Sequence, residues 1–122
     1  MATKKTANKN SARPVKTRLS AGERATEIWL TADDIHLNAE GDLYANAGAT
    51  LIEKDVSVYQ GGGGAKRNLP PGLYEYHFHA YNGSGNFTLH CRDANTGQPF
   101  PKDQPYKASG FEPFVYPFEV LT

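Results

Sequence analysis

The sequence has one cysteine, no long apolar run and almost no sustained helical periodicity. A single cysteine cannot form an internal disulfide framework, and Cys91 lies in an alternating apolar pattern that predicts a small buried side chain. No stretch is long enough for a signal-peptide core or a membrane-spanning helix. We therefore expect no membrane span and a cytoplasmic location by default, with export by a route that needs no signal peptide left open.

The net charge of zero hides an uneven distribution along the chain. Six of the thirteen basic residues precede the first acid, Glu23, which leaves seven basic residues against thirteen acidic ones, a formal charge of −6. Residues 1–22 have too few apolar side chains to offset the entropy of ordering, so we predict a disordered basic tail there and one domain over residues 23–122. The tail residues that could contact nucleic acid or another acidic surface are Lys4, Lys5, Lys9, Arg13, Lys16 and Arg18. A solvated tail is the alternative, because no aromatic side chain is available there to stack on bases.

Short alternating segments separated by turn signals predict an all-β fold. We expect a single small β-sandwich or barrel of about six to eight mostly antiparallel strands. Residues 20–31 are compatible with a short helix, through the capping-box spacing of Ser20 and Glu23, or with a strand over Glu27–Thr31. Phe114–Leu121 alternates apolar residues around Pro117, which cannot donate to a ladder, so an edge strand or a bulge is expected.

A short internal repeat and two glycine- or proline-rich stretches organise the middle of the chain. Asp34–Gly41 aligns with Asp42–Ala49, and the period of eight predicts either a β-meander that turns at 38–41 and 46–48 or the rungs of a β-helical stack. Residues 61–67 predict a flexible surface loop, because the prolines that follow forbid the helix of a phosphate-binding loop. Residues 99–110 are expected to be irregular.

Residues 73–92 predict a β-hairpin around the Gly83–Ser84 turn. Side chains alternate across a strand, so three histidines would share the polar side of this hairpin. His90 would face either His77 or His79, depending on the length of the turn.

Three converging imidazoles could bind zinc or another divalent cation and leave one coordination position open. The candidate ligands are His77, His79 and His90, with Glu75 as an additional carboxylate. The alternative is a row of ordinary histidines on a solvated sheet face. His36 has no such partner nearby in the sequence and is expected to be a half-exposed strand residue.

Aromatic residues provide a second candidate site. Trp29, Tyr44, Tyr59 and Tyr81 could form an exposed platform for a protein or a carbohydrate, or could instead belong to the core. No nucleophile elbow or paired acids point to an enzyme class, so we name no catalytic residues and no cofactor beyond the divalent metal.

Two parts of the chain resemble one family. Asp34–Gly48 is similar to the β-rich repeats near the C-terminus of the valine-glycine repeat spike proteins of bacterial type VI secretion. Phe87–Leu89, Asp93–Pro99 and Pro105–Lys107 resemble the transthyretin-like modules appended to such spikes and their effectors. The resemblance implies a non-catalytic structural or adaptor role in a bacterial secretion or phage-tail-like assembly.

The sequence thus supports three hypotheses of different class. The first is a non-enzymatic binding or adaptor module, with a protein or a carbohydrate as its partner. The second is a metal-binding protein or metal-dependent enzyme that uses the three histidines. The third is association with nucleic acid through the basic tail.

Overall fold

The structure is a computed structural model that describes residues 22–61, 63–100, 103–110 and 112–121. Within these residues the chain forms eight β-strands and one short 3-10 segment. Buried and outward side chains alternate along most strands, as expected for sheets that are covered on one face. The elements are β2 (Arg24–Ala32), β3 (Asn38–Ala45), η2 (Asn46–Gly48), β4 (Thr50–Val58), β5 (Ala65–Leu69), β6 (Gly72–Tyr81), β7 (Gly85–Asp93), β8 (Gln104–Ala108) and β9 (Phe114–Val120).

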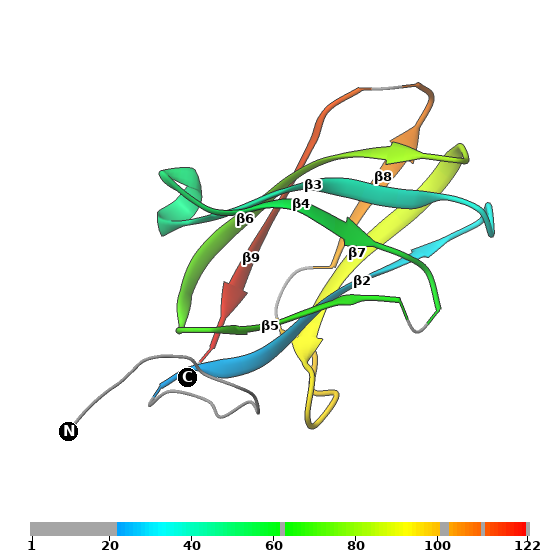
Figure 1. The fold of residues 1–122 in the computed structure, drawn as a ribbon. Helices are drawn as coiled ribbons and strands as arrows, with labels where there is room; N and C mark the ends of the chain where they lie inside the picture. Colours follow the sequence, from blue (N-terminus) through cyan, green and yellow to red (C-terminus); the bar gives the residue numbers. More distant parts are fainter. Residues whose placement is uncertain (1–21, 62, 101–102, 111, 122) are drawn as a thin grey trace.

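Two four-stranded antiparallel sheets form a β-sandwich (Figure 1). One sheet has the order β5-β2-β7-β8 and the other has the order β4-β3-β6-β9. Five of the seven connections between consecutive strands pass from one sheet to the other, and only β3–β4 and β7–β8 stay within a sheet. The predicted all-β sandwich of mostly antiparallel strands is therefore confirmed.

Aromatic side chains from both sheets fill one end of the core. Phe78 of β6 packs against Phe87 of β7 and Tyr106 of β8, with ring centroids 6.1 and 5.5 Å apart. Phe114 of β9 closes this cluster against Phe87 at 5.4 Å. Each buried aromatic side chain contributes roughly 1.5–3 kcal/mol through area removed from water, so this cluster is a major source of the stability that joins the two sheets.

Several local predictions agree with the structure. Residues 24–32 form a strand, which resolves the choice between helix and strand over Glu27–Thr31. The strand β9 carries Pro117 and lies at the edge of its sheet, as the missing N–H requires. Cys91 is 1 % exposed, and burial raises the pKa of its thiol to about 12.

Other local predictions are wrong. Asn38–Gly41 was expected to turn but belongs to β3, and only the second copy of the repeat ends in a turn, at η2. Two segments predicted as irregular instead contain edge strands: β5 begins at residue 65 within the loop expected over 61–67, and β8 lies within 99–110. Both are short strands with polar outward positions, so they carry little of the apolar alternation that identifies a strand in a sequence.

The strands β6 and β7 do not pair with each other, so the predicted hairpin over residues 73–92 is wrong. The strand β6 pairs with β3 and β9, whereas β7 pairs with β2 and β8. The predicted alternation along each strand is correct, but the two apolar sides meet across the core, where Phe78 and Phe87 are in edge-to-face contact. An alternating pattern is satisfied equally by this arrangement and by a hairpin, since both place one side of each strand in the core.

The three residues between β6 and β7 make the passage between the sheets. Asn82 adopts a left-handed backbone, with φ of 61°. The carboxylate of Asp34 accepts hydrogen bonds from the backbone N–H groups of Ser84 (3.2 Å) and His36 (2.9 Å), and these bonds lower the pKa of Asp34. A Cβ atom at Gly83 would lie 2.8 Å from the same carboxylate. The passage is therefore anchored to the turn that joins β2 to β3.

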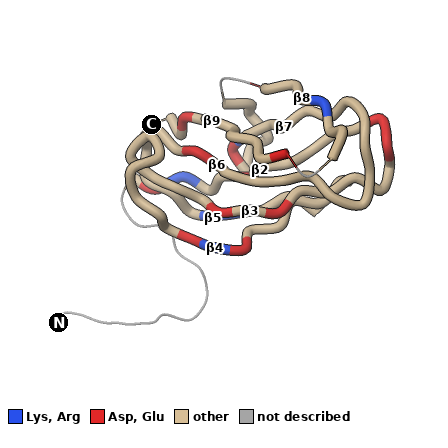
Figure 2. Tube along the Cα trace, turned by 90° about the horizontal axis from the view of Figure 1, so that it is seen from above, with Lys and Arg blue, Asp and Glu red and all other residues tan. Residues whose placement is uncertain are grey.

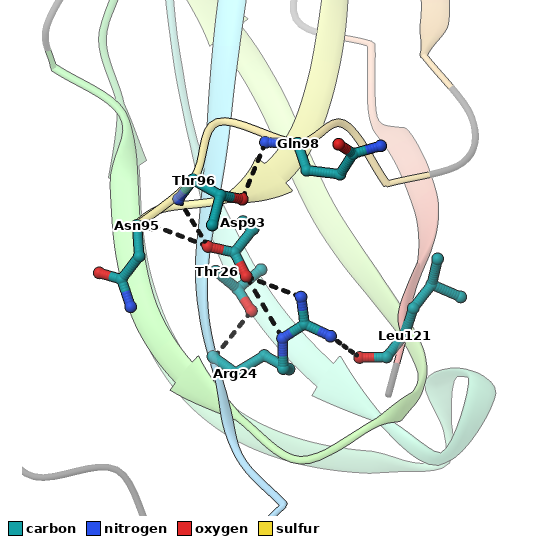
Figure 3. Close-up of polar contacts among 7 residues, drawn as sticks. All are labelled: Arg24, Thr26, Asp93, Asn95, Thr96, Gln98 and Leu121. Carbon is teal, nitrogen blue, oxygen red and sulfur yellow. Dashed lines mark hydrogen bonds and ion pairs between the residues drawn. The ribbon is translucent and has the colours of Figure 1, made fainter.

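Arg24 joins the two sheets at the end of the sandwich where β2 begins (Figure 3). Its Nη2 donates to Oδ2 of Asp93 at 2.7 Å, and its Nη1 donates to the carbonyl oxygen of Leu121, just after β9, at 2.9 Å. The other oxygen of Asp93 accepts the backbone N–H groups of Asn95 and Thr96. The hydrogen bond from Arg24, together with these backbone bonds, lowers the pKa of Asp93 to about 2.

Replacing Asp93 by Asn should lower the free energy of unfolding at pH 7 by about 2 kcal/mol. A carboxylate whose pKa is lower in the folded state stabilises the fold above its unfolded pKa of about 4, and that contribution is lost as the pH falls towards 2. Wild-type stability should therefore drop between pH 5 and pH 2 more steeply than that of the Asp93→Asn variant. Urea denaturation across this range measures both, with Asp33→Asn in the exposed turn as the control. Equal pH slopes for wild type and Asp93→Asn would contradict the assignment.

Candidate binding face

The outer face of the β4-β3-β6-β9 sheet collects tyrosine, histidine and carboxylate side chains. In the antiparallel register of β3 and β6, outward positions on the two strands lie directly opposite each other. Glu40 lies opposite His79, and Asp42 lies opposite His77. We refer to this surface as the binding face, and its members on β3 and β6 are Glu40, Asp42, Tyr44, Glu75, His77, His79 and Tyr81.

A groove of about 610 Å³ crosses the binding face between β3, β6 and the start of β9. Its polar lining consists of Glu40, Asp42 and Asp55 together with His77 and His79, and no Lys or Arg of the described residues lines it. Asp55 has a left-handed φ of 59° where the pairing of β3 with β4 is irregular, and its N–H donates to Oδ1 of Asp42 at 3.1 Å. Figure 2 shows acidic stretches along β3, β4, β6 and β9. Three carboxylates without a lining cation suit a positively charged ligand.

His77 is held in place by two neighbours on the binding face. Its Nε2 lies 2.8 Å from Oε1 of Glu75. The ring of Tyr44 lies against the imidazole, with centroids 4.4 Å apart and an interplanar angle of 38°. Because Tyr44 and Glu75 are opposite each other in the register of β3 and β6, the fold itself brings these three side chains together.

Exposed apolar side chains are concentrated on the same sheet. Of the seven large apolar residues that are exposed within the described chain, six lie on β4, β6 or β9 or directly after β4 or β9. Leu51, Leu73 and Val115 are 45 %, 55 % and 45 % exposed, and their register partners place them on the outward side. This face therefore combines a carboxylate-lined groove with exposed apolar side chains.

The structure divides the predicted aromatic platform between the two sheets. Tyr44 and Tyr81 belong to the binding face. Tyr59, which follows β4, is hydrogen-bonded to Tyr81, and burial together with this bond raises the pKa of Tyr81. Trp29 instead lies on the outer face of the opposite sheet, so the four predicted residues do not share one surface.

On the outer face of the β5-β2-β7-β8 sheet, Trp29, Arg92 and Glu27 contact one another. The guanidinium of Arg92 lies 4.5 Å from the centroid of Trp29, and its Nε donates to Glu27 at 2.8 Å. The side chain of Glu27 is 5 % exposed, partly because Gly64 lies against it so closely that a Cβ atom there would contact its carboxylate. A cation–π contact and a partly buried ion pair therefore hold Arg92 on this face.

His90 lies on this opposite face, so the structure does not form the predicted three-histidine metal site. His90 stacks on Trp29 at 4.2 Å, and its Nε2 and Nδ1 lie 2.8 Å from the hydroxyl of Thr31 and 3.0 Å from Asp103. His77 and His79 point outward from the other sheet. Within the described residues, no three His, Cys, Asp or Glu side chains are grouped so that they could hold a metal ion. The three nominated histidines therefore do not fit a shared zinc ion.

The remaining sequence predictions have different outcomes. His36 lies in the turn before β3, exposed, rather than in a strand. The six basic residues at positions 4–18 and the tail predicted over residues 1–22 fall almost entirely outside the described residues, so the hypotheses about nucleic acid and acidic surfaces stay predictions.

The carboxylates that face the histidines were not predicted as site residues. Glu40 was assigned to a turn, and neither Asp42 nor Asp55 was connected with the histidines. The signal was present in residues 38–44, where every even position is polar or aromatic, as on the outward side of a strand. The pairing of this segment with β6 could not be deduced, because it depends on the order of strands in the sheet.

Comparisons of the chain with protein-family models, curated protein sequences and solved structures find no match. The resemblance to spike-protein modules stays a prediction. No helix in the described part of the chain has the length and apolar character needed to cross a membrane.

Replacing Gly41 by Ala should destabilise the protein by about 1–3 kcal/mol, because the added methyl group would overlap the backbone of His77 and Phe78. Any relief of this overlap must separate β3 from β6 at the centre of the groove. Thermal unfolding measures the loss of stability, and the amide resonances of Asp42 and His77 measure the displacement. Gly110→Ala is the matched control, since its new methyl group would have only Glu112 nearby, at 3.9 Å. Equal stability of the two variants would contradict the predicted close approach.

Proposed function

We propose that this chain is a non-catalytic binding module that docks an extended segment of a partner protein on the binding face. The observation that carries the proposal is the one-sided placement of exposed apolar residues, six of seven on or directly after the strands of this sheet within the described chain. Exposed apolar groups gathered on one face, next to polar groups, mark a protein interaction surface. The role in a bacterial secretion or phage-tail-like assembly is proposed on the family resemblance alone.

The composition of the binding face supports a partner segment that carries both basic and apolar side chains. Lys or Arg side chains can reach the three carboxylates of the groove. Apolar side chains can cover Leu73 and Val115, which lie on adjacent strands. Tyrosines such as Tyr44 and Tyr81 provide contact area at a small entropic cost. A carbohydrate is less well matched, because the ring of Tyr44 already packs against His77.

A titration with a synthetic peptide of alternating Lys and Val residues tests this function. Saturable shifts of the Asp42, His77 and Val115 amide resonances are expected for the wild type. The double variants Glu40→Gln/Asp42→Asn and Leu73→Ser/Val115→Ser should each weaken binding about fivefold, since each removes two partly exposed contacts.

The control for this titration changes one acid and one apolar residue outside the binding face. Asp33→Asn/Ile35→Ser alters the exposed turn between β2 and β3 and should leave the affinity unchanged. Equal weakening in the control and in the face variants would show non-specific attraction. Absence of any saturable shift would refute the proposed function.

A second candidate function rests on the contacts of His90. The order of Thr31 hydroxyl, His90 imidazole and Asp103 carboxylate is that of a nucleophile, a base and its orienting group. In an acyl transfer, Oγ1 of Thr31 would attack an ester carbonyl while its proton passes to Nε2 of His90 and then to the departing alkoxide, and water would release the acyl group. Hydrolysis of p-nitrophenyl acetate that is lost in both Thr31→Val and His90→Gln would favour this function. A wild-type rate of hydrolysis equal to the rates of the two variants would reject the esterase function.

A further inference from the structure

None of the groove carboxylates forms an ion pair with a described Lys or Arg side chain. Each of the three described Arg side chains forms an ion pair elsewhere, and none of the ion pairs of the described chain includes Glu40, Asp42 or Asp55. Oδ1 of Asp42 accepts a hydrogen bond from the backbone N–H of Asp55, which is an uncharged donor. The three arginine pairs are Arg24–Asp93, Arg67–Glu53 and Arg92–Glu27.

The N-terminal part of the same chain carries positive charge that complements the carboxylates of the groove. Residues 4–18 contain six basic residues and no acid, whereas the chain from Glu23 onward carries a formal charge of −6. This segment also contains Val15 between Arg13 and Lys16, and Leu19 follows Arg18, so basic side chains have apolar neighbours. This combination of basic and apolar residues is the same as that of the partner segment described under the proposed function.

The distance between the start of β2 and the groove is within reach of this segment. Arg24 contacts Leu121 and pairs with Leu69, so β2 begins at the end of the sandwich where β6 also begins. His77 lies five residues along β6 from Gly72, about 17 Å at the rise of a strand, and the two sheets are separated by about 10 Å. The nine residues from Arg13 to Gly22 can span about 30 Å when extended.

We propose that the N-terminal segment of the same chain occupies the groove of the binding face through Lys4, Lys5, Lys9 and Arg13, in competition with the partner segment. This inference rests on the proposed function, because it assigns a second, internal occupant to the same site. Tethering gives the segment a local concentration of about millimolar, so even weak exposed ion pairs produce substantial occupancy. A partner must then displace the segment, which lowers its apparent affinity in proportion to the free fraction of the groove. High salt weakens the internal contact, because exposed ion pairs are screened.

The experiment compares three forms of the full chain. One has all six basic residues of positions 4–18 changed to Gln, another has only Lys4, Lys5, Lys9 and Lys16 changed to Arg, and the third is the wild type. The readouts are the amide resonances of Gly41, Asp42 and Asp55 at low and high salt, and the affinity for the Lys–Val peptide. Measurements at two protein concentrations tenfold apart separate contact within a chain from contact between chains.

The six-fold Gln variant is expected to shift the three groove resonances and to bind the peptide about tenfold more tightly at low salt than the wild type. The Lys→Arg variant keeps the charge and should behave as the wild type does. Raising the salt should move the wild-type resonances towards those of the Gln variant. The Gln variant with Glu40→Gln/Asp42→Asn added should show no further salt dependence at Gly41.

Three results would overturn the inference. Unchanged groove resonances and equal peptide affinities in the wild type and the Gln variant would overturn it and leave the proposed function intact. Groove shifts that grow with protein concentration would assign the occupant to a second copy of the chain and overturn the internal contact. A peptide that binds none of the three forms would refute the proposed function itself, and the inference with it.

Discussion

The passage of the chain from one sheet to the other between Tyr81 and Gly85 determines where the outward side chains of β6 and β7 lie. Asp34 holds this passage through the backbone of Ser84, and Gly83 leaves room for the close contact. Because the chain changes sheets here, the apolar sides of β6 and β7 face each other across the core. Their polar sides point to solvent on opposite faces of the sandwich. A hairpin at the same position would have merged the two polar sides into one surface.

The separation of those polar sides gives the molecule two outer faces of different character. On the β5-β2-β7-β8 sheet, Trp29, Arg92 and Glu27 satisfy one another, and none of the exposed large apolar residues of the described chain lies on its strands. On the β4-β3-β6-β9 sheet, the groove carboxylates form no ion pair with a described Lys or Arg side chain, and apolar side chains remain exposed. Exposed charge and apolar area are available to a partner, which is why we propose the second face as the binding surface.

The groove depends on backbone details as much as on its side chains. Gly41 allows β3 to approach the backbone of β6, and the irregular pairing of β3 with β4 turns Asp55 towards Asp42. Irregularities of this kind commonly re-aim a side chain at the edge of a sheet. The carboxylates of β3 and β4 therefore converge on one groove instead of spreading along separate strands, which is why a cationic segment could meet several of them at once.

Properties that depend on local pattern could be predicted from the amino-acid sequence. Alternation identified the strands with strong apolar periodicity, Pro117 marked an edge strand, and the surroundings of Cys91 predicted its burial. Which strands are neighbours could not be predicted and is known from the three-dimensional fold. The fold places His90 on one sheet and His77 and His79 on the other, with Glu40 opposite His79 and Asp42 opposite His77. The physical reason is that alternation reports only which side of a strand is buried. A strand can bury its apolar side either by pairing with the preceding strand or by lying across the core from it. The contacts that favour one position, such as that of Asp34 with Ser84, join residues far apart in the chain.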